Sequence, residues 1–497
     1  MLKTVDERKK SRLKTNMKLI LTSIASLTIG FNCFAQSNNN KSIDALKNET
    51  ATTIQSGYDA YKKIALSIWD YAELGYKENK SSTLLLNTLK ENGFTVESGV
   101  AGMPTAFVAT YGSGSPVIGI LAEYDALPGI SQDNSPVKTP LANKNSGHAC
   151  GHHLFGTGSV AAGIAIKKLL EAGKLKGTIK VFGCPAEEGG SGKVYMVRDG
   201  LFTSVDIALH WHAWDTNLVV NTSALANKSA KFRFYGIPSH AAVSPEKGRS
   251  ALDAVEAMNS MVNMMREHVP QETRIHYVIT SGGKAPNVVP EFAEVYYYVR
   301  HPDKATVLSV FDRLAKAAEG AALGTETKME YEIIGGTHDL LINKTLATSM
   351  QTNLEKVGGI AYTAEEIVFA KKLQTSFLGK SPSIDNAALI TPLHTDKDQG
   401  STDVGDVSYA VPTVGVQTAT WVPGTSAHSW QAVACGGTDI GIKGMMVASK
   451  TLAFTAIDLF TNPALIKKAK EEFIQSKGDY QYKALLGDRK PALNYRD

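Results

Sequence analysis

Apolar positions in the first half of the chain follow helical and strand periodicities in alternation. Residues 44–74 and 81–92 show the repeat of about 3.6 residues that amphipathic helices have. A third helical repeat, with small residues among the apolar ones, covers residues 154–171. Short apolar runs that predict buried strands occur at residues 107–111, 117–122, 178–183 and 207–209. Strands alternating with helices are typical of a layered α/β sheet.

The periodicity changes near residue 228. Residues 231–235 alternate polar and apolar positions, which is typical of a half-exposed strand. The next segments predict a helix, two strands, a second helix and a last strand, at residues 251–265, 275–280, 292–299, 305–322 and 328–334. This βαββαβ order predicts a compact α+β domain of ferredoxin-like type, inserted into the α/β domain.

The last third of the chain returns to the α/β pattern. A helical repeat resumes near Asp339, residues 413–417 predict another buried strand, and residues 445–460 predict a long apolar helix. Residues 380–402 are rich in Ser, Pro, Asp and Lys, so we interpret them as a surface loop or lid.

The first 35 residues have the pattern of a targeting segment. Seven basic residues precede an apolar stretch at residues 19–31, which is too short to span a bilayer. Cys33-Phe34-Ala35 then offers the small residues that a signal peptidase requires. Met17 is an alternative start, and Phe31-Asn32 do not fit the lipobox that a lipoprotein at Cys33 needs. We therefore expect an exported protein, either periplasmic or secreted.

These patterns predict the domain organisation of the chain of 497 residues, a length that favours two to four domains. The predicted parts are a signal peptide at 1–35, a linker at 36–43, the α/β domain in two pieces at 44–228 and 339–497, and the inserted domain at 229–338.

Removal of the signal peptide changes the charge of the chain. The formal net charge is +4, and residues 1–35 carry seven positive and two negative charges, so the remainder is near −1. This charge gives no reason to expect nucleic acid or a membrane surface as a partner. The three cysteines that remain, Cys150, Cys184 and Cys435, are an odd number, which argues against a disulfide framework. We expect Cys184 and Cys435 to be small core residues.

Residues 147–153, with the sequence GHACGHH, concentrate one thiol and three imidazoles in a short segment. Cys150 and His152 lie two residues apart, so a loop can aim both side chains at one point, whereas a helix cannot. The predicted helix that follows would favour a thiolate at its entrance. A transition-metal site, a thiol nucleophile with a histidine partner, and buried polar packing all remain open for this segment. His148 and His153 fit equally well as surface or capping residues.

Three further groups of candidate ligands follow the predicted strands. Glu187 and Glu188 come after one strand, His212 after the next, and His428 after the strand that ends near Gln417. Ligands of open α/β sheets bind outside the carboxyl ends of the strands, so we expect these groups to converge on Cys150 and His152. His210 would share the face of His212 if that strand continued.

The convergent set is larger than one tetrahedral zinc ion needs, which favours a site for two metal ions. Adjacent carboxylates suggest that one glutamate binds metal while the other moves a proton. Asp125 is a candidate for holding a ligand imidazole through its second nitrogen.

The motifs GHACGHH, PAEEGGSGKVYM, SHAAVSPEKGRSALDAVEAM, NVVP, STDVGDVS and AHSW resemble the M20 family of metallo-aminoacylases and carboxypeptidases, from about residue 50 to 480. The resemblance implies a zinc-exopeptidase-like catalytic domain with a mixed sheet, and a lid domain through which the protein forms a homodimer. It also implies two divalent ions, Mn²⁺ or Zn²⁺. By this resemblance the metal ligands are Cys150, His152, Glu188, His212 and His428, and the general base is Glu187.

The resemblance also assigns residues of the lid and shows two departures. His240 matches a histidine that contacts the substrate or the developing oxyanion, often across the dimer, and Asn287 and Arg300 match substrate-binding residues. Many relatives carry Asp where this chain has His153, and a metal-binding His where it has Glu123.

Together these observations predict an exported, dimeric, dinuclear amidohydrolase that cleaves the amide of an N-acyl or N-aroyl amino acid. In the implied reaction metal-bound hydroxide attacks the carbonyl, Glu187 transfers the proton, and His240 and the metals stabilise the oxyanion. The alternatives are a metallo-dipeptidase or carboxypeptidase, a non-catalytic partner subunit of a hetero-oligomer, and a thiol hydrolase built on Cys150 and His152.

Overall fold

The computed structural model describes residues 41–395 and 400–496. The predicted signal peptide lies outside the described residues and stays a prediction. Of the predicted linker, residues 41–43 are described, and they are helical. The chain divides into two compact units, Met1–Thr53 and Ile54–Asp497. In the first unit residues 41–53 form a helix, and the second unit contains both β-sheets described below.

The larger sheet of the second unit has seven strands in the order β1-β2-β6-β3-β7-β13-β8. Its strands are β1 (Thr95–Ser98), β2 (Phe107–Ser113), β3 (Val117–Glu123), β6 (Gly177–Cys184), β7 (Ile207–Trp214), β8 (Leu218–Val220) and β13 (Thr413–Ala419). The four central strands β6, β3, β7 and β13 run parallel, whereas the strands at both edges pair antiparallel. The sheet is therefore mixed, as predicted, and its parallel strands direct their carboxyl ends to one edge.

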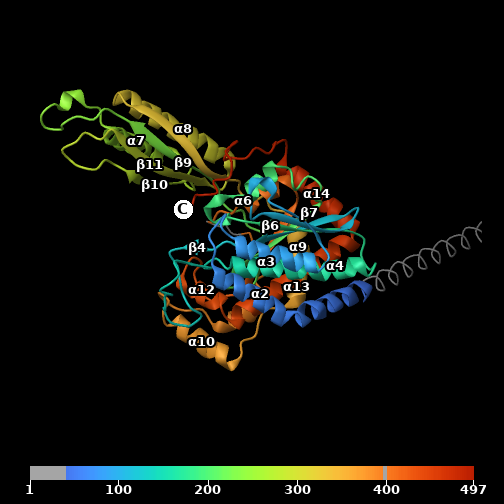
Figure 1. The fold of residues 1–497 in the computed structure, drawn as a ribbon. Helices are drawn as coiled ribbons and strands as arrows, with labels where there is room; N and C mark the ends of the chain where they lie inside the picture. The colour runs from blue at the N-terminus through green and yellow to red at the C-terminus, as the bar shows by residue number, and fades with distance from the viewer. Residues whose placement is uncertain (1–40, 396–399, 497) are drawn as a thin grey trace, which may run out of the picture. The chain divides into compact units, whose positions relative to one another are not determined.

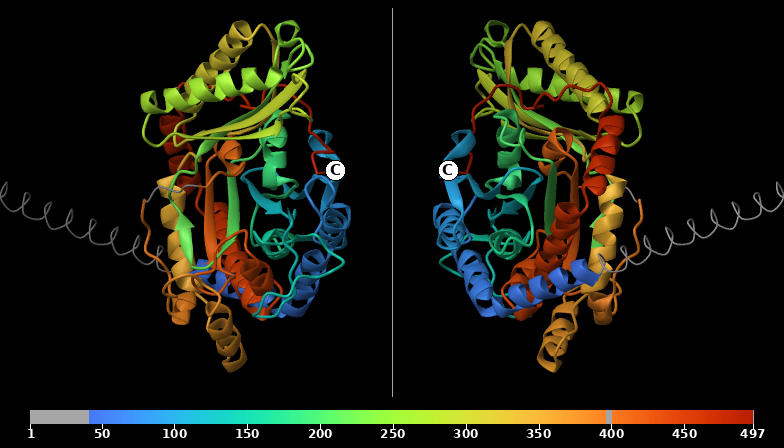
Figure 2. Two further views of the ribbon diagram at one scale, coloured as in Figure 1. Left: turned by 90° about the vertical axis from the view of Figure 1, so that its left-hand side faces the viewer. Right: turned by 90° about the vertical axis from the view of Figure 1, so that its right-hand side faces the viewer.

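Helices cover this sheet through apolar faces. The long buried helices α4 (His152–Glu171) and α13 (Asp439–Thr461) pack on each other and on the parallel strands. Their small residues permit close approach, since a Cβ at Gly158 would lie 3.0 Å from the side chains of Met445 and Trp211. Further helices that contact this layer include α2 (Tyr58–Tyr71), α3 (Asn79–Glu91), α9 (Lys344–Val357) and α14 (Pro463–Lys477). Figure 2 shows two views of this layering.

Residues 226–337 contain a second sheet and the helices that cover it. We call this segment the inserted module. Its strands β9 (Ala226–Tyr235), β10 (Arg274–Ser281), β11 (Phe292–His301) and β12 (Lys328–Thr337) pair antiparallel in the order β10-β11-β9-β12. Helices α7 (Ala251–Met265) and α8 (Lys304–Gly324) pack against this sheet (Figure 1). The element order is βαββαβ, and Phe232 and Val295 are among the fully buried residues of its core.

Among the described residues one helix, α13, is long and apolar enough to cross a membrane. Of its apolar stretch, 89% is buried inside the protein. We therefore assign α13 to the core of the fold, where a helix that is apolar on all sides belongs.

Several element bounds differ from the predictions. The predicted helix at 44–74 is interrupted at Gly57, where the ring of Tyr61 occupies the space that a Cβ would need. Strand β7 extends to Trp214, so His210 and His212 lie inside a strand and do not follow one. The pattern missed the strands β1 and β8 and the helix α14, and also the short elements α5 (Glu187–Gly190), α6 (Gly192–Arg198), α10 (Ala364–Gln374), α11 (Val404–Ala410), α12 (Trp430–Gly436), β4 (Leu127–Pro128) and β5 (Ser146–Gly147).

Candidate active site

The candidate site lies at the carboxyl ends of the parallel strands, where the sequence predicts it. Glu123 ends β3, Glu187 and Glu188 follow β6, and His212 lies near the end of β7. Because β6, β3, β7 and β13 are neighbours in the sheet, their ends deliver these side chains to one edge. Residues that are far apart in the sequence thus reach one site.

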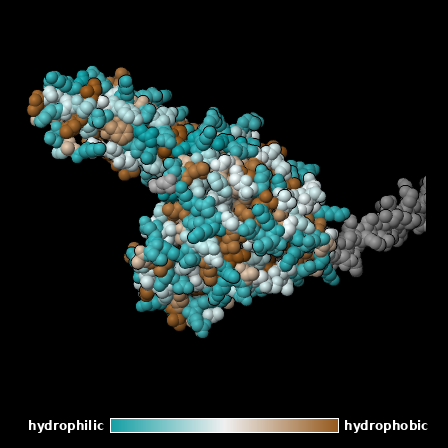
Figure 3. Space-filling view, viewed as in Figure 1, coloured by the Kyte–Doolittle hydropathy of each residue, from teal (hydrophilic) through white to brown (hydrophobic). Residues whose placement is uncertain are grey.

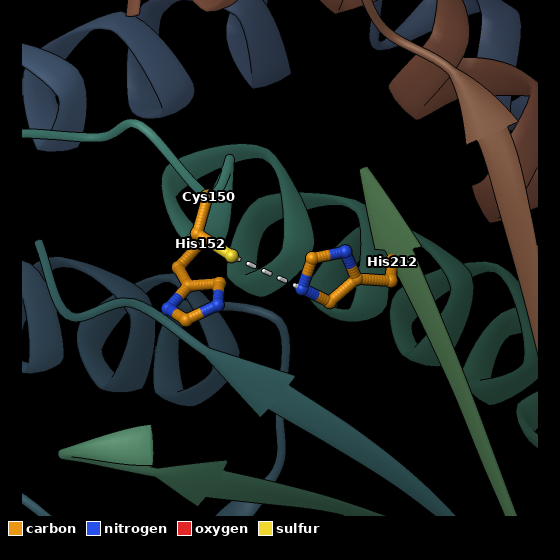
Figure 4. Close-up of side chains that lie close together, drawn as sticks. All are labelled: Cys150, His152 and His212. Carbon is orange, nitrogen blue, oxygen red and sulfur yellow. Dashed lines mark hydrogen bonds between the residues drawn. The ribbon is translucent and has the colours of Figure 1, made fainter. Parts of the chain in front are cut away.

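Cys150, His152 and His212 form the first candidate metal group. Their ligand atoms lie within 4.8 Å of one another, and Cys150 Sγ is 3.5 Å from His212 Nε2 (Figure 4). His212 Nδ1 donates to its neighbour Ala213 O at 2.8 Å, which leaves Nε2 free to accept. Cys150 precedes α4 in a turn, and His152 is the first residue of the helix. A thiolate and neutral imidazoles in this arrangement are ligands that Zn²⁺ and related ions accept.

Cys150, Glu188 and His428 form a second group of the same kind. His428 Nε2 lies 3.2 Å from Glu188 Oε1, and this carboxylate is only 11% exposed. Because Cys150 belongs to both groups, all five predicted ligands converge on one place. Glu188 Oε1 and His152 Nε2 are buried, and neither makes a hydrogen bond of good geometry: Glu188 Oε1 contacts His428 Nε2 at 3.2 Å, and His152 Nε2 contacts Glu123 Oε2 at 3.1 Å. Candidate ligands thus face one another, as they would around a cation.

Asp125 connects the two groups through its carboxylate. One oxygen accepts from His152 Nδ1 at 2.9 Å, and the other accepts from the backbone N–H of Glu188 at 2.9 Å. The first bond fixes the imidazole with Nε2 toward the site, and the second fixes the turn that carries Glu188. Asp125 therefore has the contacts that the sequence analysis expects of it.

Glu187 lies beside a buried charge network that the sequence analysis did not identify. Lys193 Nζ is 2.5 Å from Glu123 Oε1 and 2.6 Å from Asp403 Oδ1, and all three side chains are at most 1% exposed. Glu123, His152 and Glu187 also form a third group of ligand atoms within 4.8 Å. Glu123, which stands in place of an expected metal-binding histidine, thus contacts His152 Nε2 at 3.1 Å.

Burial and neighbouring charges shift the pKa values of the central groups. Burial and the nearby carboxylates of Glu123 and Glu188 raise the pKa of Glu187 well above its ordinary value. Burial and Glu188 likewise raise the pKa of the Cys150 thiol. Burial alone would lower the pKa of His152, but Cys150, Asp125 and Glu123 outweigh burial and raise it. Burial and Glu188 thus oppose the gain that the helix entrance would give a thiolate at Cys150.

The backbone around the site adopts conformations that non-glycine residues rarely take. Ala186 has φ 54°, Ser191 has φ 61° and His428 has φ 57°. The carboxylate of Glu78 accepts from the Ala186 N–H at 2.8 Å and from Thr105 Oγ1 at 2.9 Å. These contacts stabilise a turn that points adjacent glutamates in different directions.

The remaining histidines and cysteines of the sequence analysis are structural. His148 Nε2 contacts Ile68 O and His153 Nε2 contacts Gly436 O, each at 3.0 Å, so the interpretation of these histidines as surface residues is wrong. Both are at most 1% exposed. His210 is buried against Gly415 on β13 and belongs to none of the three ligand groups. Cys184 and Cys435 are free and buried, as expected.

The predicted substrate residues lie on the inserted module. His240 is exposed, and its Nδ1 accepts from the N–H groups of Ala242 and Val243 at 3.2 Å. Asn287 is exposed, and Arg300 places its guanidinium 5.4 Å from the ring centre of Tyr298. Within residues 41–395 and 400–496 no hydrogen bond or ion pair links these three side chains to the five ligands. Their predicted roles stay predictions.

Comparison with known proteins identifies the family. The model of Peptidase family M20/M25/M40 matches residues 119–375, which include four of the five ligand candidates. The chain belongs to this family. It is therefore a hydrolase of a family whose members cleave amide bonds, and the predicted resemblance to M20 enzymes is confirmed.

Individual relatives of this M20 chain cover most of its length. It is 41% identical over 449 residues to one of the p-aminobenzoyl-glutamate hydrolase subunits of Escherichia coli, covering 85% of this chain and 93% of the relative. It is 28% identical over 448 residues to Xaa-Arg dipeptidase of Mus musculus, covering 87% and 93%. A dinuclear metal-binding M20 peptidase of Bacillus subtilis shares the fold, with a TM-score of 0.56, 17% identity, and coverage of 82% and 99%.

Proposed function

We propose that this M20 hydrolase uses two divalent metal ions to cleave the amide of an N-acyl or N-aroyl amino acid, with a p-aminobenzoyl-glutamate-like conjugate as substrate class. The observation that carries the proposal is the convergence of Cys150, His152, His212, Glu188 and His428 into two groups that share the thiol. The 41% identity to a p-aminobenzoyl-glutamate hydrolase subunit supports the substrate class.

The residues present fit such ions. A thiolate, imidazoles and a carboxylate suit Zn²⁺ and also Mn²⁺, and the buried atoms His152 Nε2 and Glu188 Oε1 make no hydrogen bond of good geometry within the protein. When bound, the ions supply Lewis acidity and lower the pKa of a coordinated water. They also supply the positive charge that Cys150 needs to ionise in its buried position.

The protein's own groups provide orientation and proton transfer. Glu187 is the candidate general base, because its raised pKa lets the carboxylate take a proton from water and return it to the leaving amine. Asp125 orients His152 and the turn of Glu188 through its two hydrogen bonds. His240, Asn287 and Arg300 would contact substrate from the inserted module, and we keep these roles as part of the proposal.

A homodimer through the inserted module also belongs to this proposal. Strand β10 is the edge of its sheet, and Tyr277, Val278 and Ile279 are 39%, 54% and 40% exposed there. An exposed apolar edge strand favours pairing with a second copy. Figure 3, drawn in the view of Figure 1, shows apolar residues among hydrophilic ones on this module. A hetero-oligomer is an alternative, because the hydrolase of the Escherichia coli relative has two differently named subunits, and both are similar to this chain.

Metal removal and restoration test the function directly. The purified chain is stripped with a chelator, and its activity on p-aminobenzoyl-glutamate, a panel of N-acyl amino acids and dipeptides is measured after addition of Zn²⁺ or Mn²⁺. We expect restored hydrolysis at about two ions per chain. Faster cleavage of dipeptides would favour the dipeptidase alternative, and full metal without any hydrolysis would favour a non-catalytic subunit.

The thiol-hydrolase alternative makes an opposite prediction. It requires activity in metal-free buffer that an alkylating reagent abolishes. The buried Cys150 with its raised pKa is a poor nucleophile under those conditions. Activity that chelation leaves intact would reject the metal proposal.

A further inference from the structure

The C-terminal tail, residues 480–496, runs from the inserted module to the candidate metal site. Arg198 Nη1 donates to Gly487 O at 3.2 Å and to Arg489 O at 2.7 Å, and Tyr195 Oη donates to Lys490 O at 3.3 Å. These bonds dock the tail on α6 through its backbone. The tail therefore has a defined course along the protein.

The tail also contacts the sheet of the inserted module. Arg489 Nη1 donates to the backbone carbonyl of Ile334, and Arg489 Nη2 lies 3.3 Å from Glu332 Oε1. Gly336 lies close to the backbone of Leu485, where a Cβ would approach within 2.8 Å. Strand β12 and the tail are thus packed together before the tail turns toward the site.

The end of the tail reaches a residue that we propose as a metal ligand. Tyr495 Oη donates to the carbonyl oxygen of Glu188 at 2.9 Å, and Arg496 Nη2 donates to the same oxygen at 2.6 Å. The Tyr495 ring packs edge-on against Tyr76 at 5.5 Å, and a Cβ at Gly75 would collide with the Tyr495 hydroxyl. The absence of a side chain at Gly75 thus provides the space that the Tyr495 hydroxyl occupies.

The backbone of Glu188 needs hydrogen bonds from other parts of the chain, because the short element α5 does not provide regular helical ones at this residue. Inside α5, Glu188 has ψ 71° and Gly189 has φ 86°, so the turn is not helical at these residues. The N–H of Glu188 is held by Asp125, and its carbonyl is held by the two tail donors. The side chain between them is then left to face His428.

We propose that Tyr495 and Arg496 are positioning residues of the metal centre, which fix Glu188 as a ligand by holding its carbonyl oxygen. The inference rests on the proposed function, since it takes Glu188 to bind metal. Outer contacts that orient a ligand typically contribute about 10–100-fold to metal affinity. The tail therefore supports the candidate metal site, although none of the five candidate ligands lies in the tail.

The test compares Tyr495→Phe, Arg496→Ala and the double variant with the unmodified full chain. Tyr495→Phe retains the ring packing, so it removes the hydrogen bond without a cavity. Metal affinity is measured by competition with a chromophoric chelator, and activity is measured against added Zn²⁺ or Mn²⁺. We expect the double variant to lose about 10–100-fold in affinity for its weaker-bound ion and to recover activity in excess metal. Arg496→Lys, which keeps a donor, should retain most of the affinity.

Lys490→Ala is the matched control, because Lys490 is exposed and only its backbone carbonyl is used. It should leave metal affinity unchanged. Unchanged affinity in the double variant would overturn the inference, as would a loss of kcat that excess metal does not restore. If the unmodified chain binds no metal or cleaves no amide, the proposed function itself fails, which is a distinguishable result.

Discussion

Glu78 accepts a hydrogen bond at 2.8 Å from the backbone N–H of Ala186, the residue that directly precedes the two site glutamates. Ala186 has a positive φ of 54°, so this bond stabilises a conformation that alanine seldom adopts. Glu78 is fully buried, and burial together with Asp125 raises its pKa to about 8. The protonation of the Glu78 carboxyl group thus affects the turn that carries Glu187 and Glu188.

This raised pKa predicts a pH-dependent stability. Near pH 4 both states hold the Glu78 proton, but above pH ~4.5 the unfolded chain releases it while the folded chain retains it to about pH 8. The free energy of unfolding should therefore fall as pH rises through this window, by roughly 1.4 kcal/mol per pH unit from this group. Urea unfolding at a series of pH values measures this. Glu78→Gln should lack this component, and identical pH profiles for the two proteins would contradict the assignment.

Replacement of Glu187 by glutamine separates proton transfer from metal binding. The amide keeps the size of the side chain but cannot accept the proton, so kcat should fall by about 10²–10⁴-fold while metal content stays unchanged. Steady-state kinetics with metal analysis of the same sample checks both. Glu97→Gln, at an exposed position of β1, is the control. A parallel loss of metal would instead make Glu187 a ligand, as its closeness to Glu123 and His152 allows.

Asp125→Asn should weaken metal binding. An asparagine replaces one of the two accepting oxygens by an NH2 group, which would face either His152 Nδ1–H or the Glu188 N–H as a second donor. We expect about 10–100-fold lower metal affinity by chelator competition. Asp59→Asn, at an exposed position in the first turn of α2, should change nothing. Unaltered affinity in Asp125→Asn would mean that the two hydrogen bonds do not orient the ligands.

Lys193→Met should destabilise the fold strongly. It leaves Glu123 and Asp403 buried without their cation, a change that typically costs about 3–5 kcal/mol. Denaturant unfolding measures the loss, and adding Glu123→Gln and Asp403→Asn should restore much of it. Lys467→Met is the control, because Lys467 is 78% exposed in its pair with Glu471 and its loss should stay within about 0.5 kcal/mol. Equal stability of both variants would contradict the importance of the buried network.

Periodicity predicted the inserted module well, because its elements are amphipathic and clearly bounded. Helix α7 begins and ends where predicted, at Ala251 and Met265, and the Ser250 side chain caps it by accepting from the Asp253 N–H. Strand β7 was predicted too short because His210 and His212 interrupt its apolar run. Polar residues at the carboxyl end of a buried strand are typical of a binding or catalytic site. The two histidines therefore made the strand hard to predict and at the same time indicated a candidate site.

The candidate ligands could be named from the sequence because their residue types carry the chemistry, whereas the residues that contact and orient them could not. Lys193 and Asp403 are paired across 210 positions, and in sequence each has the appearance of an ordinary surface charge. Tyr495 and Arg496 follow no motif, and their contact with Glu188 exists only in the folded chain. Fold class, family and ligand types are thus local properties of the sequence, while the groups that orient the ligands depend on tertiary structure.

The inserted module begins and ends at adjacent points. Asn227 on β9 and Thr337 on β12 are register partners, and Asn227 Nδ2 donates to Thr337 Oγ1 at 2.8 Å. If this segment were replaced by that of a relative, the two points where it joins the chain would lie side by side in the structure, although they are far apart in the sequence. The segment can in this way be exchanged as one unit, without any alteration to the seven-stranded sheet whose strand ends hold the candidate site.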